Sequence, residues 1–162
     1  MKKALTWVAA GMLVCAATAL AQETKKVNHA IFRPAEIQWQ EAPAMLPKGA
    51  KIAVLEGDPA QEGIFTLRVW APDGYRIPPH WHPAFEHVTV ISGTFLVGMG
   101  EKADDSKLQT VPTGGFSYMG PNMPHFALIK GETVVQVHAM GPWGLYYVNP
   151  ADDPRKAAAA PK

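Results

Sequence analysis

Short runs of apolar or alternating residues, separated by turn-forming residues, make up the middle of the chain. The turns contain Gly, Pro, Asp and Ser, as in Pro72-Asp73-Gly74 and Ser92-Gly93. No helical 3.6-residue periodicity and no internal repeat stand out, so the pattern predicts short strands in an all-β antiparallel sandwich or barrel. The predicted strands are Ile52–Leu55, Ile64–Trp70, Val88–Ile91, Thr94–Met99, Gly115–Met119, His125–Ile129, Thr133–His138 and Leu145–Val148.

Two of these runs, 64–70 and 133–138, alternate between residue classes and should have an inner and an outer face. In the second run, Val135 and Val137 lie on one face, and Gln136 and His138 lie on the other. Either face can be the interior. If the polar face points inward, Gln136 and His138 line a pocket, and His138 is then the candidate catalytic acid–base residue.

The N-terminus has the layout of a secretory signal peptide. Lys2 and Lys3 precede an apolar stretch, 4–17, that is too short to span a bilayer, and Ala19-Leu20-Ala21 forms a cleavage signature before Gln22. We therefore expect cleavage after residue 21 and a periplasmic or secreted protein; the alternative is an uncleaved N-terminal anchor. Residues 22–35 are interpreted as an arm, 36–148 as one domain and 149–162 as a disordered tail.

Composition narrows the classes of partner. The 162 residues carry a net charge of +1, and loss of Lys2 and Lys3 would leave the mature chain close to neutral, with no basic run. This argues against nucleic acid as a partner, and against a membrane once the leader is removed. Cys15, the sole cysteine, lies in the predicted leader, so disulfides and cysteine nucleophiles are not expected in the mature protein.

The candidate metal-binding residues are mainly histidines. His80 and His82 are two apart, so in an extended segment their side chains share a face. Glu86 has the same parity just past a turn, and His125 stands at the head of a later predicted strand. Three imidazoles and a carboxylate suit one divalent transition metal such as Fe, Mn, Ni, Co or Zn. An octahedral ion would keep two positions free for water, oxygen or substrate.

A lone His-x-His pair is more simply explained as surface histidines in a proline-rich loop. Here the pair comes with a carboxylate, a downstream histidine and glycines around both segments, which together favour a metal site. His87 has the opposite parity to Glu86 and is expected to face away from it. Arg76 shares the parity of His80 and is either a contact for an anionic substrate or, more simply, a surface residue.

These residues carry a resemblance to a known family. The stretch Gly74-x5-His80-x-His82-x3-Glu86-x6-Gly93 resembles the first motif of the cupin superfamily at every signature position. The second motif is looser: Gly114 and His125 match, whereas Gly120, Asn122 and Ile129 replace the usual proline, glycine and asparagine.

The resemblance covers roughly residues 36–148. The chain is similar to small bacterial single-domain cupins and to the cupin half of ChrR-type anti-sigma factors. It implies a β-jelly-roll barrel (a double-stranded β-helix) with one metal held inside by His80, His82, Glu86 and His125. It also implies a small-molecule substrate or ligand and a homodimer. The function it favours is an oxygenase-like metalloenzyme; the alternative is a metal-dependent binding or sensing module without turnover.

Overall fold

The computed structural model describes residues 29–157. The chain divides into two units, residues 1–31 and 32–162, and every described helix and strand belongs to the second. The predicted signal peptide and its cleavage site before Gln22 lie outside the described residues. Within 29–157, no helix is long and apolar enough to cross a bilayer.

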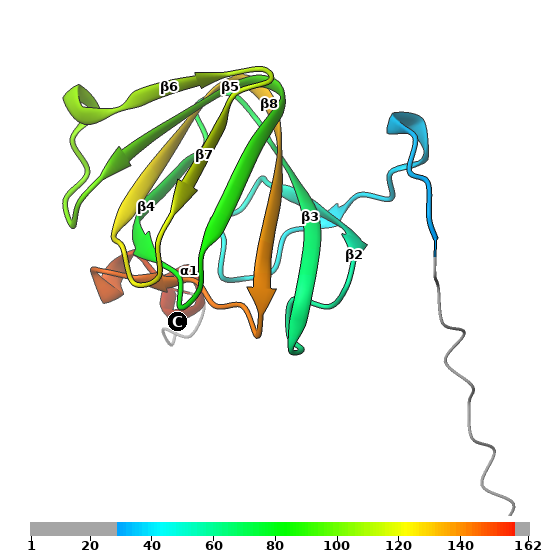
Figure 1. Ribbon diagram of the computed structural model, residues 1–162. Helices are drawn as coiled ribbons and strands as arrows, with labels where there is room; N and C mark the ends of the chain where they lie inside the picture. Colours follow the sequence, from blue (N-terminus) through cyan, green and yellow to red (C-terminus); the bar gives the residue numbers. More distant parts are fainter. Residues whose placement is uncertain (1–28, 158–162) are drawn as a thin grey trace, which may run out of the picture. The chain divides into compact units, whose positions relative to one another are not determined.

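Strands dominate the second unit (Figure 1), as the hydrophobic pattern predicts. Helical segments are short in residues 29–157: three 3-10 turns, η1 (Pro34–Glu36), η2 (Asp105–Lys107) and η3 (Pro150–Asp152), and one α-helix, α1 (Pro154–Ala157). The strands are β1 (Gln40–Glu41), β2 (Lys51–Glu56), β3 (Gly63–Ala71), β4 (Arg76–Trp81), β5 (Glu86–Met99), β6 (Gln109–Pro112), β7 (Phe116–Met119), β8 (His125–Gly141) and β9 (Tyr146–Tyr147).

All nine strands of the described part of the chain belong to one curled antiparallel sheet. The long strand β8 is its centre, because it pairs with β3, β4 and β5. Strands β6 and β7 extend the sheet from β5, and β1 and β2 extend it from β3. Segments far apart in sequence are thereby brought around a common interior.

Strands β5 and β8 each continue through a segment predicted to be a turn. The β5–β8 register shifts on both sides of Ser92, and Gly93 and Gly131 take positive φ angles of 80° and 69° there. The Thr133 hydroxyl lies in the bend, where it accepts the Thr94 N–H at 3.0 Å. The two bulged, bent strands β5 and β8 therefore stand where four straight strands were predicted. Their bends let the sheet curl.

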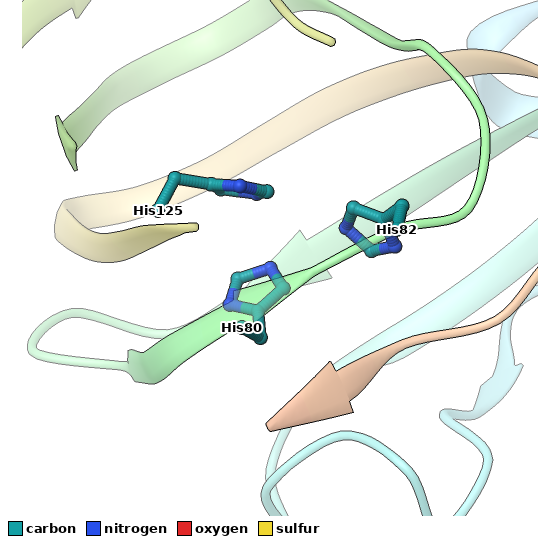
Figure 2. Close-up of side chains that lie close together, drawn as sticks. All are labelled: His80, His82 and His125. Atoms are coloured by element: carbon teal, nitrogen blue, oxygen red, sulfur yellow. The ribbon is translucent and has the colours of Figure 1, made fainter. Parts of the chain in front are cut away.

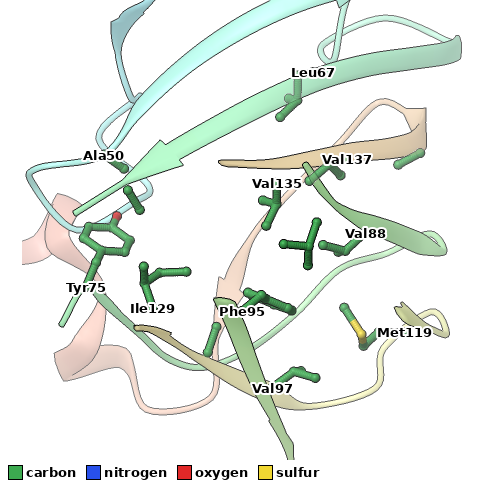
Figure 3. Packing of buried hydrophobic residues seen from close by; sticks show 14 of the residues in the cluster. Ala50, Leu67, Tyr75, Val88, Phe95, Val97, Met119, Ile129, Val135 and Val137 are labelled. Carbon is green, nitrogen blue, oxygen red and sulfur yellow. The ribbon is translucent and has the colours of Figure 1, made fainter. Parts of the chain in front are cut away.

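The core lies on the concave side of the sheet (Figure 3). In the second half of β8, Val135, Val137 and Ala139 are buried, and the half-buried Gln136 and His138 alternate with them. The valine face is thus the interior, because strand alternation sends the polar pair to the opposite side. Of the two arrangements compatible with the sequence, the one that places His138 inside is wrong.

Strand β4 was not among the predicted strands. Its sequence contains Pro78 and Pro79, which cannot donate to a ladder and mask the strand pattern. The β4–β8 register accommodates them by a shift between Ile77 and His80.

The C-terminal segment differs from the predicted disordered tail. Residues 150–157 form η3 and α1, and Asp153 is buried. Arg155 donates to Asp153 at 2.8 Å and to the Leu145 carbonyl oxygen at 3.2 Å, which ties the segment to the loop before β9. Residues 158–162 lie outside the described range.

Candidate metal centre

Three buried histidines converge at one point inside the barrel (Figure 2). His80 lies near the end of β4, His82 follows that strand directly, and His125 is the first residue of β8. One ring nitrogen of each lies within 4.8 Å of those of the other two. The sequence prediction that these three residues meet is confirmed.

Strand pairing explains the convergence. β4 pairs with β8 so that His80 stands opposite His125. His82, two residues on, keeps the parity of His80, and the ring centroids of the two lie 5.1 Å apart.

Backbone carbonyl groups set the tautomer of all three rings. Nδ1 lies 2.8 Å from the Pro78 oxygen in His80, 2.8 Å from the Gly144 oxygen in His82 and 2.9 Å from the Met123 oxygen in His125. A carbonyl oxygen can only accept, so each Nδ1 carries the hydrogen and donates it. Each Nε2 is then left with a free lone pair, the form in which imidazole binds a metal.

Glu86, the first residue of β5, brings a carboxylate to the same point. Its Oε1 lies 3.7 Å from Nε2 of His82, and its Oε2 lies 3.3 Å from Nε2 of His125. Nε2 of His82 is buried and has no hydrogen-bond partner. Lone pairs and a carboxylate facing one another repel unless a cation lies between them, so this donor set fits a metal ion.

The electrostatics agree with that arrangement. Burial, together with the neighbouring His125 and His82, lowers the pKa of His80 to about 3. Burial also lowers the pKa of His82. For Glu86, burial alone would raise the carboxyl pKa, but His82 and His125 outweigh it and lower the pKa to about 2. At neutral pH His80 and His82 are therefore neutral, and the Glu86 carboxylate is ionised.

Aromatic rings form one wall beside the donors. The Trp143 ring stacks on His82 with centroids 4.2 Å apart and planes 17° apart, and Phe65 packs edge-on against Trp143 at 5.5 Å. Phe65 is 0% exposed. Trp143 was not among the candidate site residues of the sequence, because it lies outside both motifs and reaches His82 through the loop after β8.

A cavity of about 230 Å³ adjoins the donors. Its lining includes all four candidate ligands together with the exposed residues Pro43 and Ala60, so it extends from the buried histidines to the protein surface. A small molecule can therefore reach the donor atoms.

His138 does not line this cavity. Its ring lies on the outer face of the sheet, where Nε2 accepts from the Gln136 amide at 3.0 Å and Nδ1 faces the Thr66 hydroxyl at 3.2 Å. The prediction of His138 as a catalytic residue is therefore not supported, because its neighbours Val137 and Ala139 occupy the inward positions.

The remaining candidates lie on the outside as well. His87 stacks with the exposed rings of Phe85 and Phe116, facing away from Glu86, as its parity predicts. Arg76 is exposed and makes a two-pronged contact with Asp105, with both distances 2.8 Å. It is a surface ion pair rather than a substrate contact.

Comparison with known proteins places this geometry in a family. The ChrR cupin-like domain matches residues 27–143 of the chain. The chain belongs to the ChrR cupin-like family. The predicted cupin resemblance and the jelly-roll barrel are thereby confirmed. A search of curated proteins found no match.

Solved structures share the fold of this cupin at low identity. The polyketide cyclase RemF from Streptomyces resistomycificus has a TM-score of 0.65 and 15% identity, with 82% of this chain and 94% of that chain covered. A candidate acetylacetone dioxygenase from Methylibium petroleiphilum has a TM-score of 0.60 and 19% identity, and the match covers 80% of this chain and 87% of that chain. The complex of Rhodobacter sphaeroides SigE with the anti-sigma ChrR has a TM-score of 0.50 and 17% identity, and the match covers 67% of this chain and 52% of that chain.

Proposed function

We propose that this cupin is a metal-dependent enzyme acting on a small molecule, with one divalent transition metal held by His80, His82, His125 and Glu86. The observation that carries the proposal is the meeting of three Nε2 lone pairs and a carboxylate in a cavity that extends to the surface. A metal that served only to hold the fold would not need such access.

The protein groups have distinct roles in this proposal. The histidines and Glu86 hold the ion, and the carbonyl groups of Pro78, Gly144 and Met123 keep each ring in the metal-binding tautomer. The stacked Trp143 shields His82 from water. When bound, a metal of this class supplies Lewis acidity and exchangeable positions for an electron-donating substrate group.

For the reaction class we favour a dioxygenation. Both atoms of O2 then enter the product and all four electrons come from the substrate, so no further reductant is required. The names of the structural neighbours include a cyclase and a dioxygenase, so the fold by itself does not choose between reaction classes.

The test combines metal analysis with oxygen uptake. Protein purified from its native compartment should hold about one metal ion per chain. A panel of small carboxylates, enediols and thiols should include a compound consumed one-for-one with O2 without added reductant. The His82→Ala, His125→Ala double variant is the control. Stoichiometric metal in that variant would refute the ligand assignment, and failure of every compound with every metal would refute the enzyme proposal.

A second candidate is a metal-dependent sensor or binding module without turnover. The specific observation in its favour is the family match, because a ChrR protein occurs as an anti-sigma partner of SigE in one solved structure. The same panel separates the two functions. Ligands that bind reversibly, with no product for any metal, would support the sensor.

We further propose that the protein is exported to the periplasm or beyond, on the strength of the leader described above. The intact mass of exported protein should correspond to residues 22–162. A mature protein that still carries Met1 or Cys15 would instead indicate an N-terminal anchor.

A further inference from the structure

We infer that the ligand of this site is a compact, largely apolar molecule with a single electron-donating polar end. This inference rests on the proposed metal site. The chemistry of the cavity wall indicates the class of substrate.

The wall beyond the candidate ligands is apolar. Strands β2, β3, β5 and β8 all contribute to it, and on each of them strand alternation turns aliphatic or aromatic side chains inward. These inward side chains include Ile52, Leu67, Val69, Phe95, Val135 and Val137.

Few polar groups interrupt this wall, and the two hydroxyls among them are already bonded. The Tyr75 hydroxyl donates to the Pro47 carbonyl oxygen at 2.6 Å. The Thr133 hydroxyl accepts the Thr94 N–H at 3.0 Å and lies 3.1 Å from the Gly131 oxygen. Among the described lining residues, Glu86 and the three histidines carry the only ionisable groups besides Tyr75, and the Trp143 indole N–H is the one further donor.

The cost of desolvation follows from this inventory. A hydroxyl moved from water into an apolar wall without a partner costs roughly 1–3 kcal/mol in proteins, and an unpaired charge costs more. A sugar, polyol or phosphate ester would bring several such groups, and the wall has neither a lysine nor an arginine to meet an anion. A ligand with a single polar end avoids this cost, because the metal can replace the water molecules that solvate that end.

Size sets a second limit. An apolar cavity of about 150 Å³ accepts benzene, so a cavity of about 230 Å³ has room for roughly nine non-hydrogen atoms. Met45 and Leu46, from the loop between β1 and β2, complete the lining. Methionine is unbranched and adapts to irregular partners, so this part of the wall can fit ligands of slightly different shape.

The experiment uses Co(II)-loaded full-length protein, whose visible absorption reports on groups that bind the metal. Straight-chain carboxylates from propanoate to octanoate are titrated in order. Affinity should rise about fourfold per added methylene, from ~0.8 kcal/mol per buried CH2, until the cavity is full. Heptanoate should bind at least tenfold more tightly than 6-hydroxyhexanoate, which has the same number of non-hydrogen atoms but ends in a hydroxyl.

A variant pair on β3 tests the wall itself. Leu67 is buried in the cavity wall, whereas Ile64 on the same strand is 65% exposed. Leu67→Ala should move the optimum chain length up by about two carbons, and Ile64→Ala should leave it unchanged. Circular dichroism checks the fold, and Leu67→Val, with a shift of about one carbon, replaces Leu67→Ala if that variant does not fold.

The outcomes separate the two proposals. If Co(II) does not bind, or binds equally well to the His82→Ala, His125→Ala variant, the metal site fails and the ligand class fails with it. If Co(II) binds but affinity is flat along the series, or 6-hydroxyhexanoate matches heptanoate, the ligand class is overturned while the metal site stands.

Discussion

His82 donates its Nδ1–H to the carbonyl oxygen of Gly144 at 2.8 Å, across 62 positions of the sequence. The loop that carries Gly144 also carries Trp143, whose ring stacks on the same imidazole. One loop after β8 thus fixes both the tautomer and the plane of a ring that follows β4. The free Nε2 of His82 is a product of tertiary structure as much as of the His-x-His motif.

Loss of that ring should weaken metal binding sharply. His82→Ala removes one of the converging donors and should lower metal affinity at least tenfold, since even changes to the groups that orient ligands cost about 10–100-fold. Calorimetric titration of metal into metal-free protein measures the affinity. His87→Ala is the matched control, because that ring lies on the outer face. An unchanged metal affinity in the His82→Ala variant would show that His82 is not a ligand.

Metal-free protein should remain folded at neutral pH and lose stability on acidification. None of the four candidate ligands is a member of the apolar core cluster. In the native state His80, with its pKa near 3, and His82 stay neutral, whereas in the unfolded chain they bind protons below about pH 6.5. The unfolded state then holds more protons, so acidification favours it, by at most about 1.4 kcal/mol per pH unit for each group.

Below about pH 4.5 the Glu86 carboxyl adds to the loss, because its pKa is lowered to about 2 in the folded protein. Urea unfolding at pH 6.5, 5.5 and 4.5 measures the slope. His80→Gln should flatten it and His87→Gln should not. A slope that His80→Gln leaves unaltered would contradict the assigned titration.

The bend of β5 offers a test of stability. Gly93 has φ of +80°, and a Cβ placed on it would collide with the Thr133 side chain and the Glu132 carbonyl oxygen. Gly131 has φ of +69°, but a Cβ there would meet nothing within 4 Å. Gly131→Ala should therefore cost only the ~1–2 kcal/mol of a left-handed alanine. Gly93→Ala should cost more than that or prevent folding, as thermal unfolding will show; equal costs would mean that the bend can relax.

Two tyrosine hydroxyls hold the loop between β1 and β2 over the cavity lining. Tyr147 donates to the Met45 carbonyl oxygen at 2.8 Å, and Tyr75 donates to that of Pro47. Tyr147→Phe removes a bond worth about 0.5–1.5 kcal/mol, so amide exchange at Met45 and Leu46 should accelerate about two- to tenfold. Tyr146→Phe is the control, since that ring is exposed and stacks on Trp81. Exchange unaffected by Tyr147→Phe would show that packing alone holds the loop.

Local spacing was sufficient to predict the fold class and the shared face of His80 and His82, whereas His125 was assigned to the same site through the cupin resemblance. His80 and His82 share a face in any extended segment, and the glycines at 74 and 93 mark turns and bends whatever surrounds them. Short apolar runs between turn formers predict strands because their period is a property of the backbone itself. These features depend on neighbours a few residues apart, so they can be read from the sequence.

Tertiary structure decided what depends on partners far along the chain. Whether Val137 or His138 points inward is settled by the register of β8 against β3 and β5, since a strand's alternation is the same in either orientation. The union of predicted short strands into β5 and β8 depends on bulges that appear only when the two strands pair. The Trp143 ring over His82 and the apolar wall of the cavity arise because the closed sheet brings remote strands around one interior. The shared face of His80 and His82 was therefore determined locally, whereas the approach of His125 and the space in front of the donors were determined by strand pairing and packing.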